Sequence, residues 1–545
     1  MLWTRDRDRL LSATFWALFA ALSVISLVPL WSVRIPPMQD FWQHLALVDV
    51  IHSLDDPGSI YPDYFVLPSA PRPNLILYYG TNLVEYLVPL ESAGKVVLST
   101  YILTFPLAFL YLLRSFGKSR WLAFFCFPLV YNCMFAYGFV SFLLGMPLLL
   151  WGLGAYRRYV APREDEPPLR FGIQAAVALL LAFFTHAHIY LMLSLLCGIV
   201  LVLHRHKLWG TALRAWPFVP ALAFFVPWFV VYFLEQTPAT SGMKFGSLET
   251  LFGPTFYKPS TILTSFFHYV GDYFQGEADD AIFVALMLVA MVLLMLRKAP
   301  EVPAGAGRKL ARFDLEILTL VLMFSVLLLP QHIQAQSIVS LRHVVFTVLF
   351  FFGWLGFESA PKRVVVPAVA ILVALHVASV LNLNAGFRAF EREIDVYPTL
   401  FDRTEGWKRL LKVAYNQESD VVNHGAFWHM HFFYALQKGG ISDVQFAEYP
   451  HNPIQYRQGM VPPKPNIEKS PSEFFRSPDM RYFEYLLLRK GSSPSTKTVA
   501  ESIELLADNR EWALYRFTES PRPRPEDATV SPSGRRDPVD SREAR

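Results

Sequence analysis

Charged residues are scarce in this sequence. Asp, Glu, Lys and Arg together make up 17% of its 545 residues, whereas an ordinary globular chain carries about 25%. Hydrophobic residues make up 53% and aromatic residues 15%. One aqueous core cannot bury that much apolar surface, so much of the chain should face lipid. This balance excludes a soluble enzyme, a disordered protein and a nucleic-acid-binding protein, and the net charge of +4 identifies no partner.

Cysteines and glycosylation signals are also rare. The three cysteines, Cys126, Cys133 and Cys197, all lie inside apolar runs, so they do not indicate a disulfide framework. The sequence contains no Asn-x-Ser/Thr acceptor. That absence favours a bacterial membrane over a eukaryotic secretory one.

Long apolar runs, in contrast, are frequent. A membrane-spanning helix needs about 20 apolar residues to cross roughly 30 Å of hydrocarbon. About eleven segments fit this requirement, near 11–31, 96–113, 121–136, 139–156, 171–187, 188–203, 215–234, 281–296, 315–330, 343–357 and 364–381. The first run is too long for the apolar part of a signal peptide and no cleavage motif follows it, so we expect it to remain as an anchor.

Basic residues fall in every second loop. After Arg5, Arg7 and Arg9, the basic loops carry Arg114/Lys118/Arg120, Arg157/Arg158/Arg163, Arg205/Lys207/Arg214, Arg297/Lys298/Arg308/Lys309/Arg312 and Lys362/Arg363. Because basic loops stay in the cytoplasm, the pattern predicts a cytoplasmic N-terminus and an extracytoplasmic C-terminal region at a bacterial inner membrane. Three outer segments are then large: 32–95, 235–280 and the region from 383 onwards.

The region after the last span has a different composition, with frequent polar residues and short β-like runs. We expect an all-α, polytopic transmembrane domain at 1–382, a small extracytoplasmic α/β domain at 383–519 and a disordered tail at 520–545, where Pro, Ser, Arg and Asp dominate. Within the outer domain the pattern predicts strands at Phe483–Leu488 and Trp512–Phe517, and helices at 387–415 and 424–437.

Asp40 and His44 open the first outer segment, directly after Pro36 and Pro37. An amphipathic helix is predicted from there to about Leu54, at the outer membrane interface, and the spacing of four places both side chains on one face. A partly desolvated carboxylate that is hydrogen-bonded to an imidazole suits a general base. The same residues also fit a variant capping box, in which Asp40 is only a helix cap and His44 an ordinary interfacial histidine.

The order of these features resembles the GT-C superfamily of membrane glycosyltransferases, in which an outer acid and a loop helix follow the first span and a C-terminal outer domain follows many short-looped spans. The spacing of Pro37, Asp40 and His44 is similar to the first-loop pattern of bacterial members. The turns Tyr137-Gly138-Phe139 and Thr185-His186-Ala187-His188 are also similar, and the resemblance covers residues 1–382 in topology. The first acid is a single Asp rather than an Asp-Asp or Asp-Glu pair, which leaves the acceptor type and the metal dependence open.

The resemblance implies transfer of a sugar, with inversion, from a polyprenyl-phosphate carrier to an acceptor on the outer face. Asp40 would deprotonate the acceptor hydroxyl, and cations or hydrogen-bond donors would offset the charge that develops on the departing lipid phosphate. The sequence requires no cofactor, although a divalent metal is compatible with it.

Arg342 is the cation best placed for that task, because with His343 it lies where an outer loop enters the tenth span. A guanidinium matches phosphate geometry, although arginines at this depth also commonly reach towards lipid head groups. His186 and His188 occupy a tight outer turn and fit either a metal or donor-phosphate site or simple helix capping.

A helix-like run at Ser260–Phe274 carries His268 and Asp272 four residues apart. It could lie flat and shape a substrate groove. Asp272 and the acids that follow it are more typical of a solvated face than of a second catalytic carboxylate.

In the outer domain, His424, Trp428 and His431 share one face of the predicted helix, with His429 to one side. Plain packing, sugar stacking on Trp428 and metal binding all fit this pattern. A structural zinc site usually needs four ligands, and no cysteine lies nearby.

The alternative function is a multi-pass transporter, or a flippase for lipid-linked substrates, without covalent chemistry; a scaffold without chemistry is a third. Transporters place ionisable groups near mid-bilayer. Here the span centres contain almost no charge, and a central Asp would cost about 2.5–3.5 kcal/mol. The candidate polar residues gather at the outer ends of the spans, which favours interfacial chemistry.

Overall fold

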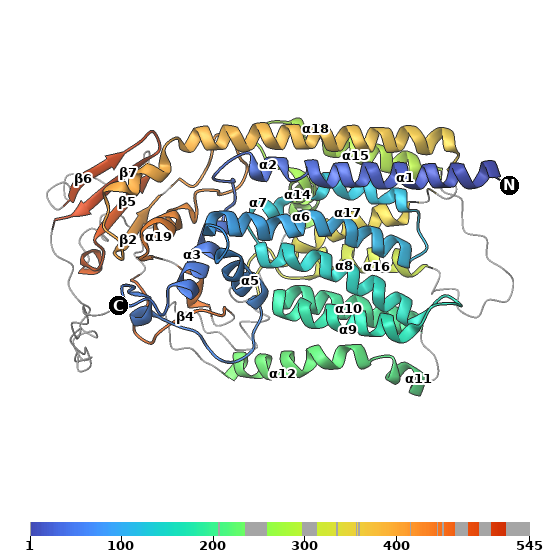
Figure 1. The fold of residues 1–545 in the computed structure, drawn as a ribbon, viewed down its shortest axis with the longest axis horizontal. Coiled ribbons are helices and arrows are strands. Elements are labelled where there is room, and N and C mark those ends of the chain that lie inside the picture. The colour runs from blue at the N-terminus through green and yellow to red at the C-terminus, as the bar shows by residue number, and fades with distance from the viewer. Residues whose placement is uncertain are drawn as a thin grey trace, which may run out of the picture.

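A computed structural model describes residues 2–518, except for 205–207, 235–258, 297–312, 334–335, 356, 358–359, 415, 444, 450–451, 464–477 and 490–502. Long helices run side by side along the longest axis of the molecule, and a β-sheet lies at one end of them (Figure 1). The predicted disordered tail at 520–545 lies outside the described residues.

The bundle consists of α1 (Leu2–Ile25), α2 (Val28–Trp31), α6 (Leu90–Ser115), η1 (Arg120–Leu129), α7 (Cys133–Ala136), α8 (Val140–Val160), α9 (Pro168–Thr185), α10 (Ala187–Leu203), α11 (Leu208–Leu213), η2 (Trp216–Phe218), α12 (Val219–Leu234), α14 (Pro259–Gly271), α15 (Ala278–Met295), α16 (Asp314–Leu328), α17 (Arg342–Trp354) and α18 (Lys362–Ile394). Among the described residues, seven helices are long and apolar enough to cross a membrane. The other four predicted spans, near 121–136, 188–203, 315–330 and 343–357, form shorter helices. The molecule is therefore built as a polytopic membrane protein, while the total of eleven spans stays a prediction.

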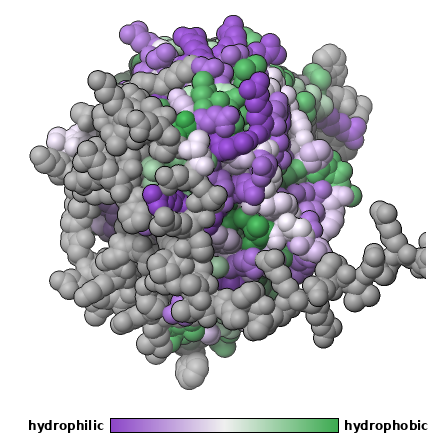
Figure 2. Space-filling model, turned by 90° about the vertical axis from the view of Figure 1, so that its left-hand side faces the viewer, coloured by the Kyte–Doolittle hydropathy of each residue, from purple (hydrophilic) through white to green (hydrophobic). Residues whose placement is uncertain are grey.

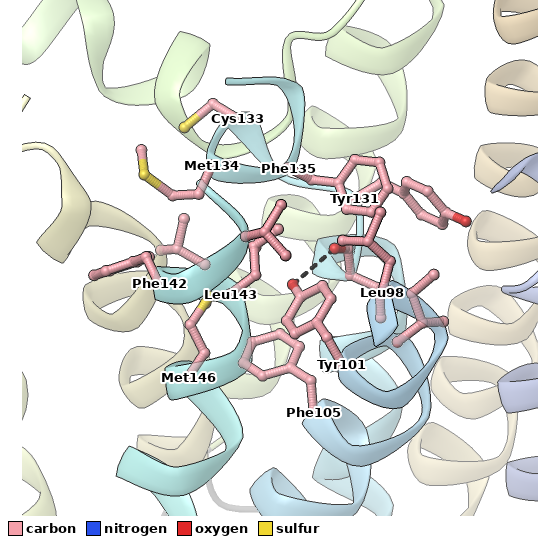
Figure 3. Packing of buried hydrophobic residues seen from close by; sticks show 14 of the residues in the cluster. Leu98, Tyr101, Phe105, Tyr131, Cys133, Met134, Phe135, Phe142, Leu143 and Met146 are labelled. Atoms are coloured by element: carbon pink, nitrogen blue, oxygen red, sulfur yellow. Dashed lines mark hydrogen bonds between the residues drawn. The ribbon is translucent and has the colours of Figure 1, made fainter. Parts of the chain in front are cut away.

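The segment at 121–136 differs from a regular spanning α-helix. It forms the ten-residue 3₁₀-helix η1 and then the single turn α7, which begins where the Asn132 side chain accepts a hydrogen bond from the Met134 amide. Its aromatic side chains are buried inside the bundle, and the Tyr101 hydroxyl donates to the Val130 carbonyl at 2.8 Å (Figure 3). Because a 3₁₀-helix rises about 2 Å per residue, this short element still extends far along the bundle axis.

Ion pairs gather several of the basic loops at one end of the bundle. Lys118 forms an ion pair with Glu316 at 3.7 Å. The Asp314 carboxylate contacts both Arg157, at 2.5 Å, and His204, at 3.1 Å. The sheet and the first outer segment lie at the opposite end (Figure 1). The loops therefore divide between two ends as the charge pattern predicts. Which end faces the cytoplasm stays a prediction, and the basic stretches at 205–207 and 297–312 lie outside the described residues.

The first outer segment forms α3 (Phe41–His52), α4 (Tyr61–Tyr64), β1 (Phe65–Val66) and α5 (Leu75–Glu85). The prediction of an amphipathic surface helix after Asp40 is wrong in one respect. Helix α3 is buried on most of its circumference, because Phe, Trp, Leu and Val side chains occur all round it, including Phe41, Trp42 and Leu47. It packs against α5 and α6 and against the C-terminal region.

The C-terminal region contains η5 (Tyr397–Arg403), β2 (Arg409–Val413), η6 (Met430–Phe432), α19 (Phe433–Lys438), β3 (Ile441–Ser442), η7 (Phe446–Glu448), β4 (Gln455–Tyr456), η8 (Pro478–Tyr482), β5 (Tyr485–Arg489), β6 (Ile503–Asp508) and β7 (Trp512–Phe517). Five strands form one sheet in the order β3-β2-β5-β7-β6, with β2 parallel to β3 and β5, and β7 antiparallel to β5 and β6. The strand at 512–517 is confirmed, and the predicted strand at 483–488 corresponds to β5, which begins two residues later and ends one residue later.

Both predicted helices of this region are only partly present. The first ends at Ile394, and strand β2 occupies 409–413, where Leu410 and Leu411 are buried between β3 and β5. In the second, residues 424–429 form irregular turns and only 433–438 form an α-helix. Packing in the sheet outweighs the helical periodicity of the first run. In the second run, His424 and His429 instead bond Pro37 and Asp40 at the bundle end.

Two features join the C-terminal region to the rest of the molecule. Helix α18 continues without a break from Lys362 to Ile394, across the predicted domain boundary at 382/383. Strand β1 of the first outer segment pairs with β4, with Phe65 opposite Tyr456. The outer elements thus form one cap over the bundle end, and its described surface is largely hydrophilic (Figure 2). In contrast, Ile173, Leu288 and Ile371 are exposed along the sides of α9, α15 and α18, as expected of lipid-facing helices.

Candidate active site

A cavity of about 400 Å³ lies where the cap meets the bundle. Its walls come from segments far apart in the sequence: Asp40 and His44 at α3, His186 between α9 and α10, Arg342 at the start of α17, and Trp428 in the cap. These five sequence-derived candidates therefore converge on one site. The other three, His188, His343 and Asp272, are not among the residues that line it.

The loop before Asp40 is fixed from three sides. The Pro37 carbonyl accepts hydrogen bonds from the Tyr273 hydroxyl at 2.8 Å and from His424 Nε2 at 2.9 Å. The amides of Gln39 and Asp40 donate to the carbonyls of residues 136 and 137 at 3.0 and 3.1 Å. A rigid backbone therefore presents the acid to the cavity, which is what a preorganised site requires.

Gly138 makes this close approach possible. Its φ is +72°, a left-handed conformation that favours glycine. A Cβ at this position would lie 2.7 Å from the Asp40 nitrogen and 2.8 Å from the Phe41 nitrogen. The Tyr137-Gly138-Phe139 turn is thus a direct support of the loop that carries Asp40.

The Asp40 carboxylate does not cap α3, so the capping interpretation of this residue is wrong. Its Oδ1 accepts instead from His429 Nδ1 at 2.8 Å and from Gln39 Nε2 at 3.2 Å. The expected Asp40–His44 hydrogen bond is not among the described contacts, since His44 Nδ1 bonds the Tyr78 hydroxyl at 2.8 Å. The imidazole that pairs with Asp40 comes from the cap and not from the same helix.

His44 is uncharged at neutral pH. Burial lowers the pKa of His44 to about 4, although the nearby Asp40 carboxylate acts in the opposite direction. Its ring also packs against Phe446, with centroids 5.1 Å apart. His44 therefore contributes a fixed neutral wall beside the acid.

Arg342 is a buried cation without a carboxylate partner among the described residues, and only 5% of it is exposed. Its Nη1 lies 3.2 Å from His186 Nε2, Nη2 donates to the Ser337 carbonyl at 3.1 Å, and the guanidinium stacks over Phe139 at 4.4 Å. Its Nε is buried without a hydrogen-bond partner in the described structure. A buried charge without a counter-ion is costly, so a bound anion would stabilise this end of the cavity.

His186, His188 and His343 form a connected group of contacts next to Arg342. His186 caps α10, since its Nδ1 accepts from the His188 amide at 3.2 Å. His188 Nε2 meets His343 Nε2 at 2.8 Å, and His343 Nδ1 meets Ser325 Oγ at 2.6 Å. The capping interpretation of this turn is thus confirmed for His186, which also lines the cavity.

Asp272 belongs to a clamp between the second outer segment and the cap. It bonds His268 Nδ1 at 2.5 Å and also the side chain of Asn423, next to an isolated bridge between Phe274 and Val422. Its hydrogen bonds to His268 and Asn423 lower the pKa of Asp272 against the opposing effect of burial, and its hydrogen bond raises the pKa of His268. Asp272 is therefore positioned to hold elements together and not to contact a ligand in the cavity.

His429 and Asn74 are cavity residues that the sequence did not single out as site residues. His429 lies in an irregular turn and not on the expected helix, so helical periodicity pointed it away from the site. Asn74 precedes α5 in a left-handed conformation, and neither position carries a sequence signal of its own. Within the described ranges, no group of three or more His, Cys, Asp or Glu side chains is arranged to hold a metal ion.

No protein-family model matches the sequence, and no curated protein sequence matches it either. Among solved structures, the chain is similar to the crystal structure of ArnT from Cupriavidus metallidurans bound to undecaprenyl phosphate, at 13% identity, with a TM-score of 0.57 over 92% of this chain and 98% of that one. The chain therefore shares the fold of this ArnT structure. It also matches arabinofuranosyltransferase AftD from mycobacteria, at 16% identity and a TM-score of 0.49 over 92% of this chain and 41% of that one. The ArnT overlap covers 92% of the chain, so it extends beyond residues 1–382 into the cap.

Replacement of Gly138 by alanine should destabilise the protein. The added Cβ clashes with the backbone of Asp40 and requires a left-handed alanine, which together cost about 1–3 kcal/mol. We expect a lower apparent melting temperature in detergent than for the wild type. Gly198→Ala is the matched control, because this helical glycine has open space around its Cβ position; equal effects of the two changes would contradict a supporting role of Gly138.

The Asp272–His268 pair should give stability a specific pH dependence. The raised pKa of His268 stabilises the folded state below its unfolded pKa, near 6.5, and this contribution is lost as the pH rises through the folded value. The lowered pKa of Asp272 stabilises the folded state above its unfolded pKa, near 4, and is lost at lower pH. The pair therefore contributes most between about pH 4 and 6.5.

Asp272→Asn should lower the apparent melting temperature more at pH 6 than at pH 9. Melting curves of both proteins across this range measure the difference. Glu277→Gln is the control, because Glu277 is an exposed acid five residues further along the chain and its side chain makes no cap hydrogen bond to α15. If the apparent melting temperatures of the wild type and Asp272→Asn changed with pH in parallel, the Asp272–His268 pair would not account for the pH dependence.

Proposed function

We propose that this protein is an integral membrane glycosyltransferase that moves a sugar from a polyprenyl-phosphate carrier to an acceptor hydroxyl at the extracytoplasmic face, with inversion at the sugar carbon. The observation that carries the proposal is the shared cavity of Asp40 and Arg342, which are, apart from histidine, the only charged side chains among the described residues that line it. An acid and a cation without a counter-ion in one cavity suit a reaction that removes a proton and releases an anion.

The cation end fits the phosphate of the donor. A guanidinium can form two parallel hydrogen bonds to phosphate oxygens, and the Arg342 Nε has no other described partner. The hydroxyl of Ser141, at the start of α8, also lines the cavity and is buried without a described partner. A bound phosphate would satisfy both groups. The fold shared with ArnT, whose crystal structure contains undecaprenyl phosphate, supports this class of donor.

Asp40 acts as the general base in this proposal. The acceptor O–H gives its proton to the Asp40 carboxylate as the oxygen forms a bond to the anomeric carbon. The bond from that carbon to the phosphate oxygen breaks, and its electron pair leaves with the lipid phosphate, where Arg342 offsets the charge. Attack from the side opposite the leaving group inverts the anomeric centre.

His429 is a positioning residue for the base. With Nδ1–H donating to Asp40, the imidazole orients the carboxylate. His44 keeps its place beside them as a neutral side chain. In this proposal Asp40 therefore acts together with His44 and with His429, which comes from the cap.

Asp40→Asn should abolish sugar transfer, with a loss of about 10²–10⁴-fold in turnover, because an amide cannot accept the proton. The assay uses purified full-length protein in lipid nanodiscs with radiolabelled sugars on polyprenyl phosphate and membrane extract as the acceptor source. His429→Gln should fall between the wild type and Asp40→Asn, since it retains a hydrogen-bond donor but no imidazole.

Asp63→Asn is the matched control, because Asp63 is an exposed acid of the same outer segment. Unchanged transfer by Asp40→Asn would remove Asp40 from the mechanism. Substrate movement across wild-type vesicles without any covalent product would favour the transporter or flippase.

Arg342→Gln should reduce kcat/KM by about 10²–10³-fold, the usual effect of losing a donor that stabilises a developing anion. Arg342→Lys should be intermediate, because an ammonium keeps the charge but loses the planar fork. Binding of undecaprenyl phosphate, measured by microscale thermophoresis, should weaken in the same order.

Arg388→Gln provides the control, as Arg388 is an exposed arginine on α18 away from the cavity. Equal phosphate binding by the wild type and Arg342→Gln would place the donor elsewhere. Because Arg342 supplies the positive charge in this proposal, transfer should continue in the presence of EDTA; loss of activity that Mg²⁺ restores would instead assign that charge to a metal.

A further inference from the structure

The cavity has a second wall that the proposed donor chemistry does not use. It is formed by cap residues Trp428, Phe446, Tyr449 and Asn452, together with Asn74 from the first outer segment. These side chains are aromatic rings and amides, without a formal charge among them. We infer that this wall is the acceptor subsite, and that the acceptor is a saccharide whose ring stacks on Trp428. The inference rests on the transferase function proposed above and deepens it.

Trp428 is held as a platform. Lys412 Nζ donates to its carbonyl at 2.6 Å and lies 5.7 Å from the ring centroid, and the Trp428 amide donates to the Gly425 carbonyl at 3.0 Å. A Cβ at Gly425 would overlap the indole, so the glycine lets the ring lie against the backbone. Even so, 42% of Trp428 remains exposed while it lines the cavity.

An exposed indole in a cavity fits the C–H face of a sugar ring. The face of an aromatic ring carries partial negative charge and the C–H bonds of a pyranose carry partial positive charge, so the two surfaces attract each other and exclude water. A flat ring of fixed orientation also loses little conformational entropy when it binds. A peptide hydroxyl would offer no comparable flat face.

Asn74 adds hydrogen-bonding groups of the right kind. It occupies the N-cap position of α5, where an Asn side chain normally accepts from the helix backbone, but its φ of 67° is left-handed and it makes no cap hydrogen bond. The described structure contains no hydrogen bond of its side chain, although the residue is only 9% exposed. An amide both donates and accepts, as sugar hydroxyls do, so a polyhydroxyl ligand satisfies it.

The platform also lies next to the proposed base. Trp428 and His429 are consecutive, so their Cα atoms are about 3.8 Å apart, and His429 bonds Asp40 at 2.8 Å. A sugar on the indole is therefore held beside the carboxylate that would deprotonate one of its hydroxyls. The bundle wall then binds the donor phosphate, and the cap wall binds the acceptor.

The test measures acceptor binding without transfer. Full-length Asp40→Asn protein in nanodiscs is titrated with methyl glycosides of glucose, galactose, mannose and arabinose, using saturation-transfer difference NMR. We expect at least one glycoside to bind. Trp428→Ala in the same background should weaken its Kd by about tenfold, equivalent to losing about 1.4 kcal/mol of stacking, and Asn74→Ala should weaken it as well.

Trp16→Ala is the matched control, because Trp16 is 44% exposed on α1 and far from the cavity in sequence and fold. Gly425→Ala displaces the indole without removing it and should mimic Trp428→Ala; if either variant has lost the wild-type melting temperature, the other carries the comparison. Absence of binding by every glycoside, or binding that Trp428→Ala leaves unchanged, would overturn the inference.

The outcomes separate this inference from the transferase itself. Glycoside binding that depends on Trp428, combined with no sugar transfer by the wild-type protein, would support the saccharide site and contradict the transferase. Transfer to serine or threonine peptides without any glycoside binding would keep the transferase and overturn the saccharide acceptor.

Discussion

The whole site depends on a backbone contact between two segments almost one hundred residues apart. The amides of Gln39 and Asp40 donate to carbonyls at the end of α7, and Gly138 is the residue that permits this distance. Without that contact, these hydrogen bonds would no longer fix the backbone of Asp40 relative to the bundle. With it, the acid is fixed relative to α8 and, through the bundle, relative to Arg342. The surrounding hydrogen bonds to Pro37 extend the same constraint to the second outer segment and to the cap.

The two charged side chains of the cavity, Asp40 and Arg342, do not form an ion pair with each other. Among the described residues, Arg342 is buried over Phe139 without a carboxylate partner. The described hydrogen bonds of the buried Asp40 side chain come from the His429 imidazole and the Gln39 side-chain amide. Placing them as a direct ion pair would have stabilised the empty protein and neutralised both groups. Keeping them apart leaves each available for a different part of a reaction, at the cost of desolvating two charges. Such a cost is characteristic of sites shaped for function rather than for stability.

Much of this arrangement could be predicted from sequence, for identifiable reasons. The apolar runs are long and regular, so the helices around the cavity were expected near their observed positions. Asp40, His186 and Arg342 were found because each follows or precedes such a run, where polar side chains meet the membrane boundary. Residues of the cap were harder. The runs at 387–415 and 424–437 have helical periodicity, but Leu410 and Leu411 are buried in a sheet and residues 424–429 are irregular. His429 was therefore assigned the wrong orientation, because tertiary packing and not local pattern determines where it lies.

The continuity of α18 has a mechanical consequence. Its 33 residues correspond to about 50 Å of helix at 1.5 Å per residue, roughly 20 Å more than a bilayer's hydrocarbon core. The C-terminal part of α18 therefore extends beyond the hydrocarbon core. It leads directly into the cap, which contains the sheet, Trp428 and His429. Because α18 continues from the bundle into the cap, a change in its tilt would also change the distance between the cap and α3.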